Sequence, residues 1–152
     1  MDIKETIKYH VLDINELFTA YIELHDYILK SSSTFLSLFK KVDFDDIYNR
    51  TKKLLSQFNQ KKGELINLQN NFNNTVPKEY IQYFNQLYTF FERLYETVSL
   101  LNEKQYKLLL KSKGNKYSYK YFIERENKYK KAIELYMIEA EKLENIDYII
   151  FN

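Results

Sequence analysis

Apolar residues recur at alternating steps of four and three along most of this chain, and this spacing constrains the fold more than any other feature. Such spacing puts one residue per turn on a single helical face, and that face must be buried against another helix. The clearest run, in the third of four such segments, is Tyr80, Phe84, Leu87, Phe91, Leu94, Val98, Leu101, Gln105 and Leu108. The chain has two glycines and one proline in 152 residues, which are too few for the turns of most β-rich or α/β folds.

The pattern therefore predicts an all-α protein, an antiparallel up-down-up-down four-helix bundle with long coiled-coil-like helices. We expect helices over residues 2–30 with a short continuation at 34–41, then over 43–73, 77–112 and 118–145. Serines at 31–33 indicate a kink or a break in the first helix, because serine side chains compete for backbone hydrogen bonds. The connections are short, so successive helices should be antiparallel neighbours within one domain, 1–152. The apolar tail, 146–152, is expected to dock on the bundle or on another chain.

The residues that common enzymes and cofactor proteins need are missing. Two glycines cannot supply a glycine-rich phosphate loop, and zero cysteines exclude a thiolate metal site. Di-iron bundles use Glu-x-x-His pairs, but the residues three before His10 and His25 are Ile7 and Ile22. We therefore expect a protein that is not an enzyme and that has no cofactor and no metal.

Sequence features that bear on location are also few. The start of the chain lacks the basic and apolar regions of a secretory signal, and no apolar run approaches the ~20 residues of a membrane span. Zero cysteines suit a reducing compartment. These features predict a cytoplasmic protein with no membrane partner.

A net charge of +2 conceals an uneven distribution. In an antiparallel bundle the connections near residues 41–43 and 113–116 share one end, and lysines gather there, whereas acidic residues gather at the other end. The residues that we expect to contact an anionic partner are Lys113, Lys116, Tyr117, Tyr119, Lys120, Arg125, Lys128, Lys52 and Lys53. Cations interleaved with aromatic rings suit single-stranded nucleic acid. The alternative is that these lysines neutralise the acidic helix start at 43–46 or form a solvated face.

Polar residues interrupt the apolar stripe at similar heights below the basic end. We expect Thr51, Gln105 and Glu126 to form one buried, hydrogen-bonded layer, joined by Ser32 if the first helix is continuous. Such a layer would fix the register of the helices, and a small ligand or ion pocket is the alternative. His25 and Lys61 also fall on the stripe; we expect His25 to be satisfied by a hydrogen bond and Lys61 to extend its ammonium out of the core.

Fifteen tyrosines exceed what the core of a small bundle needs. Several lie off or beside the main stripe, namely Tyr48, Tyr83, Tyr88, Tyr95, Tyr106 and Tyr117. They indicate either second-row packing or a surface for a partner or a homo-oligomer, with the apolar tail as another route to assembly.

Together these features predict a non-enzymatic helical protein that acts by binding another protein. Adaptor, inhibitor, immunity-type and phage or mobile-element accessory roles all fit this description. The alternative is nucleic-acid binding through the basic, tyrosine-rich end of the bundle. A bundle enzyme or a ligand carrier would require the polar layer to open to solvent.

Overall fold

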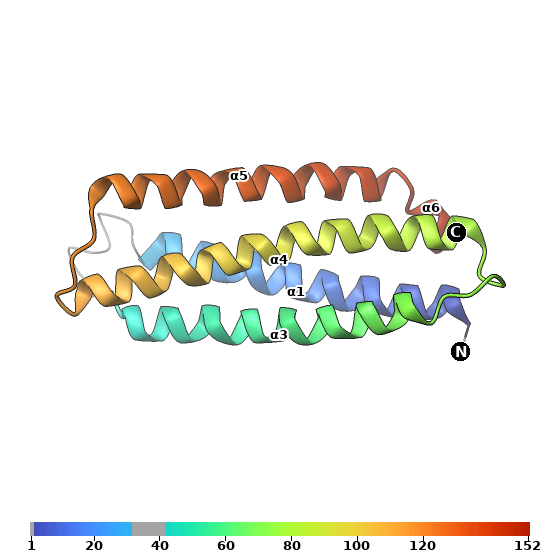
Figure 1. The fold of residues 1–152 in the computed structure, drawn as a ribbon, viewed down its shortest axis with the longest axis horizontal. Helices are drawn as coiled ribbons and strands as arrows, with labels where there is room; N and C mark the ends of the chain where they lie inside the picture. The colour runs from blue at the N-terminus through green and yellow to red at the C-terminus, as the bar shows by residue number, and fades with distance from the viewer. Residues whose placement is uncertain (1, 32–41) are drawn as a thin grey trace.

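The computed structural model describes residues 2–31 and 42–152, which form an elongated antiparallel helical bundle without strands (Figure 1). Its elements are α1 (Ile3–Ser31), α3 (Phe44–Asn70), α4 (Lys78–Ser112), α5 (Tyr119–Glu144) and the short α6 (Tyr148–Phe151). The predicted all-α bundle and its four long helices are confirmed. The predicted continuation at 34–41, the break before it and Ser32 lie outside the described residues.

The helix ends follow from the residues at them. The Asp43 carboxylate accepts from the Asp46 backbone N–H at 3.0 Å, and the Ser118 hydroxyl accepts from the Tyr121 N–H at 3.1 Å. Each bond satisfies one of the free donors at a helix start. After α4 the chain turns at Gly114, whose φ of 94° lies in the left-handed region that glycine tolerates. The Asn115 N–H then returns to the Leu110 carbonyl at 3.0 Å and closes a Schellman-type cap.

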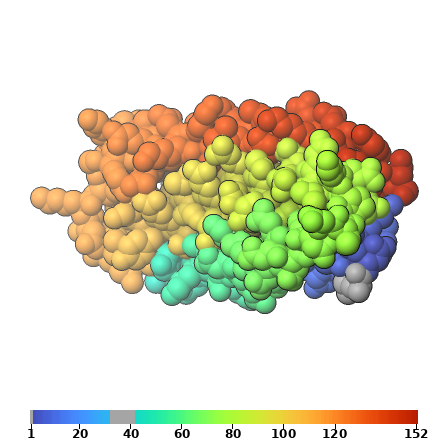
Figure 2. Space-filling model, turned by 45° about the vertical axis from the view of Figure 1, so that its right-hand side comes forward, coloured from blue at the N-terminus to red at the C-terminus, as the bar shows by residue number. Residues whose placement is uncertain are grey.

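The central element is α4, which packs against α1, α3 and α5. In the space-filling view it runs between α5 on one side and α3 on the other (Figure 2). Its stripe residues Phe84, Leu87, Phe91 and Leu94 are all at most 1% exposed. Phe91 stacks on Phe58 of α3, with 5.5 Å between the ring centroids. A wide apolar face of this kind lets one helix serve several neighbours.

The other pair of neighbours, α1 and α5, lie farther apart. No Cα atom of α1 comes within 8 Å of a Cα atom of α5 among the described residues. Aromatic side chains bridge the interval instead: the Phe18 and Tyr136 rings meet edge-to-face at 5.6 Å, and Tyr21 meets Tyr136 at 6.1 Å. At Phe18, Tyr21 and Tyr136 these two helices are therefore bridged by rings and not by close backbone packing.

The C-terminal tail docks on its own bundle, one of the two outcomes expected from its composition. α6 contacts α1 and α4, and Ile150 is fully buried. The Tyr83 hydroxyl donates to Asp147 Oδ1 at 2.9 Å, and the Lys4 ammonium donates to the Asn152 carbonyl at 3.0 Å. None of the helices that the structure describes has a segment that is long and apolar enough to span a bilayer.

The Phe58–Phe91 stack should be a major source of stability, because both rings are fully buried. We expect Phe58→Ala to lower the free energy of unfolding in urea by about 3–5 kcal/mol. Met137→Ala is the matched control on an exposed position, with 59% exposure, and should change it by less than about 0.5 kcal/mol. A loss below about 1 kcal/mol for Phe58→Ala would contradict this packing.

Candidate interaction surfaces

The turn between α4 and α5, together with the first half of α5, carries most of the cations expected to meet an anionic partner. Lys113, Lys116, Lys120 and Lys128 are exposed, and Tyr119 is 78% exposed. Lys113 lies 3.6 Å from Asp45 of α3, but both side chains are more than half exposed, so this pair contributes little stability. These lysines and the Tyr119 ring are therefore presented to solvent together.

Two other predicted contact residues are engaged within the bundle. Arg125 Nη1 lies 2.7 Å from Glu103 Oε1, and its guanidinium covers the Tyr121 ring at 4.6 Å. Tyr117 is half-buried and meets Tyr121 edge-to-face at 5.3 Å. Burial raises the pKa of Tyr117, whose hydroxyl has no hydrogen-bond partner among the residues that the structure describes. Arg125 and Tyr117 thus both pack against the Tyr121 ring near the start of α5.

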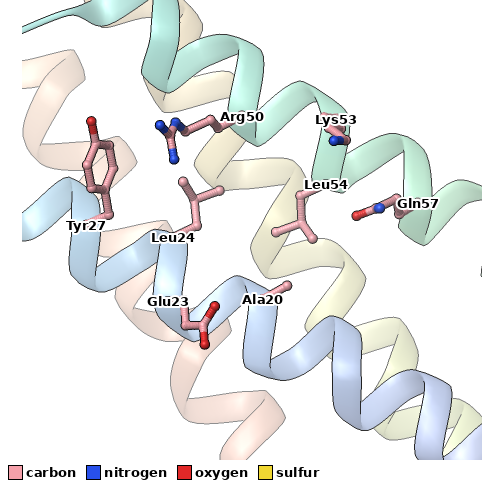
Figure 3. A pocket seen from close by; sticks show the side chains of 8 residues that line it. All are labelled: Ala20, Glu23, Leu24, Tyr27, Arg50, Lys53, Leu54 and Gln57. Carbon is pink, nitrogen blue, oxygen red and sulfur yellow. The ribbon is translucent and has the colours of Figure 1, made fainter.

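Lys52 and Lys53 do not join this group, because they lie on α3, on the opposite side of α4 from α5 (Figure 1). Lys53 lines a separate groove of about 320 Å³ between α1 and α3 (Figure 3). There Arg50 covers the Tyr27 ring at 4.7 Å and pairs with Asp46 at 2.9 Å. The predicted cationic residues therefore form two groups on different faces.

The three residues of the predicted polar layer make separate contacts. Thr51 is fully buried, donates to the Tyr48 carbonyl at 2.9 Å and accepts from the Asn102 amide at 3.0 Å. Gln105 is 2% exposed, and its Nε2 has no hydrogen-bond partner within residues 2–31 and 42–152. Glu126 is half-buried and pairs with Lys104 across α4 and α5. No direct hydrogen bond joins these three residues, so the expected single network is not formed.

A hydrogen-bonded network does cross the seam between α1 and α5. The Tyr21 and Tyr129 hydroxyls share a hydrogen bond at 2.6 Å, and His25 Nδ1 lies 2.7 Å from the Tyr129 hydroxyl. Burial raises the pKa of Tyr21 and of Tyr129, and burial lowers the pKa of His25. His25 has the hydrogen bond expected for it, but its partner Tyr129 and the further bond from Tyr129 to Tyr21 were not foreseen.

Lys61 is 5% exposed and reaches carboxylates between α1 and α3. Its ammonium lies 2.5 Å from Asp13 Oδ2 and from Glu64 Oε2, and 3.4 Å from His10 Nδ1. Burial acts to lower the pKa of Lys61, but hydrogen bonds to the two carboxylates outweigh burial and raise it. Burial, and next the Lys61 charge, lower the pKa of His10. The ammonium thus ends in an ion-pair cluster and not in free solvent.

An apolar groove of about 410 Å³ opens between α1 and α5, near the acidic end of the bundle. α4 supplies two of its apolar residues and α6 one; the lining consists of Val11, Leu12, Ile14, Asn15, Phe18, Leu87, Phe90, Ala140, Leu143, Glu144, Asp147 and Phe151. Leu12 is 58% exposed and Phe151 46% exposed. The sequence analysis did not identify this groove; the available signal was Leu12, an apolar residue beside the stripe position Val11.

Among the residues that the structure describes, no group of three or more histidine, aspartate or glutamate side chains is arranged to hold a metal ion. Comparisons with protein-family models, curated proteins and solved structures gave no match. The function must therefore be inferred from the surfaces of the chain itself.

The two histidines should make the fold less stable in mild acid. Both have pKa values lowered in the folded state, so the unfolded chain takes up protons near pH 6.5 that the folded chain does not. We expect the free energy of unfolding in urea to fall as the pH decreases from 7.5 to 5.5. A variant with His10→Asn and His25→Asn should be less stable at pH 7.5 but less sensitive to pH. A wild-type stability that is constant or rises over this range would contradict the prediction.

Proposed function

We propose that this protein acts by binding another protein, and that the groove between α1 and α5 receives a helix of that partner. The observation that carries this proposal is a mainly apolar lining that the bundle leaves open to solvent. Leu12 and Phe151 stand exposed beside it. Contiguous exposed apolar surface of this kind is typical of protein interaction sites. An amphipathic helix in an apolar groove is a recurring mode of recognition.

A non-catalytic role fits the polar groups as they are arranged. Lys61 is held by two carboxylates, and His25 and Tyr21 both bond to Tyr129, so these groups satisfy one another. An adaptor or inhibitor needs a stable shape and an exposed contact surface, and this bundle offers both. The cysteine-free composition suits an interaction in the cytoplasm.

The groove should account for partner capture from the native host. We expect the tagged wild-type chain to retain a protein partner identified by mass spectrometry, and Leu12→Asp to lose it, because a carboxylate would be desolvated at an apolar interface. Leu29→Asp is the matched control, because it makes the same substitution at an equally exposed leucine of α1 that does not line the groove, and it should retain the same partner. Capture that survives Leu12→Asp would contradict a partner site in this groove.

Nucleic-acid binding is a second candidate, favoured by the exposed Tyr119 and Lys120 at the start of α5 and by Lys116 in the turn before them. If this end binds phosphates, a labelled single-stranded oligonucleotide should bind at 50 mM salt and weaken steeply towards 200 mM. A variant with Lys116→Gln and Lys120→Gln should show a shallower salt dependence, and Lys142→Gln at the other end should not. The absence of any binding at 50 mM salt would remove this candidate.

A further inference from the structure

We propose, on the basis of the protein-binding function above, that the helix received by the α1–α5 groove is cationic and amphipathic. Its apolar face would enter the groove, and lysine or arginine residues beside that face would meet the carboxylates of Glu144 and Asp147. The geometry of the two walls points to a helical partner. The negative charges of the lining residues point to a positive charge on that partner.

The walls of the groove favour a helix over an extended peptide. Both walls are themselves helices, and the α1 lining residues extend from Val11 to Phe18, which is about two turns and ~10 Å. An extended peptide would place unpaired backbone N–H and C=O groups against apolar side chains. A helix satisfies its own backbone and can lay one row of side chains between two others. The contact length matches apolar anchors at positions i, i+3 or i+4, and i+7.

Among the described residues, the two charged ones that line the groove are both acidic. Glu144 is exposed at the end of α5, and Asp147 lies in the connection to α6. Asp147 Oδ1 accepts from the Tyr83 hydroxyl at 2.9 Å, which fixes the direction of this carboxylate. Glu141, one turn before Glu144, adds another exposed carboxylate. A partner with positive charge beside its apolar face would complement this edge.

Nearby cations do not cancel this negative edge. Lys8 lies one turn before Leu12 on α1, and its ammonium pairs with Glu5 at 2.9 Å. Lys4 donates to the Asn152 carbonyl at 3.0 Å. Lys142 of α5 lines a different pocket, on the α4–α5 face, and pairs with Glu139 at 3.3 Å. The groove itself therefore presents apolar surface and negative charge.

Charge at the edge of an interface governs specificity and association rate more than total affinity. The apolar residues should therefore determine whether a helix binds, and Glu144 and Asp147 should determine which helix binds best. This division makes the two parts of the proposal separable by experiment.

The test uses three synthetic helical peptides of about 18 residues, long enough to form helix on binding. They share one Leu/Phe face and differ only at the flanking positions, which hold Lys, Gln or Glu. Binding to the full-length chain is measured by fluorescence anisotropy at 50 and 200 mM salt. We expect the Lys peptide to bind best, with a Kd at least about tenfold below that of the Glu peptide at 50 mM, and the difference to shrink at 200 mM.

Variants of the protein assign the preference to the groove. Glu144→Lys should weaken the binding of the Lys peptide and strengthen the binding of the Glu peptide. Glu124→Lys is the matched control, because it makes the same charge change at an exposed position near the other end of α5 and should leave the order of affinities unchanged. Leu12→Asp should weaken the binding of all three peptides.

The outcomes separate the two proposals. If none of the peptides binds, the proposed function fails together with the inference. If the three peptides bind equally and all are lost in Leu12→Asp, the groove is a binding site but the cationic partner is wrong. A Lys peptide that binds Glu144→Lys and Leu12→Asp as well as wild type is held elsewhere, which also overturns the inference. Sedimentation showing a dimer that Leu12→Asp dissociates would replace the cationic partner with a second copy of this chain.

Discussion

The burial of α4 is the constraint on which the rest of the structure depends. Its apolar face is wide enough to pack against α1, α3 and α5, and its central stripe residues Phe84, Phe91 and Leu94 are fully buried. Because α3 and α5 both pack on α4, they are fixed on opposite sides of it. α1 completes the bundle beside α3 and α4, and aromatic rings carry its contact with α5. The open seam follows from this arrangement, since α1 cannot approach α5 without displacing those rings.

The fold was predictable because its signals are local. Seven-residue spacing fixes which face of each helix is buried, and Asp43, Ser118 and Gly114 stand where the chain must start or end a helix. The sequence also indicated that the tail would be buried, on this bundle or on another chain, because Ile149 and Ile150 could not remain in water without cost. Each of these inferences needs only neighbours in the sequence.

The candidate surfaces were less predictable, because the spacing gives height along the bundle and not the distance between two helices. Lys53 and Lys120 were grouped by height, but α4 lies between their helices. Thr51 and Gln105 are both buried as expected, yet each depends on neighbours that height alone does not identify. The groove at Leu12 depends on the width of the α1–α5 seam, which the volumes of Phe18, Tyr21 and Tyr136 set. The spacing of apolar residues along a single helix carries no information about the width of that seam.

The openness of the α1–α5 seam is the central claim, and thiol labelling tests it most directly, because the chain has no cysteine of its own. Ala140 lines the groove, whereas Ala132 on the same helix is 4% exposed in the core. In the variants A140C and A132C, each with a single thiol, we expect a maleimide to react with position 140 at least about tenfold faster than with position 132 under native conditions. Equal protection of the two thiols would show that α1 closes over α5, and the groove would not exist in solution.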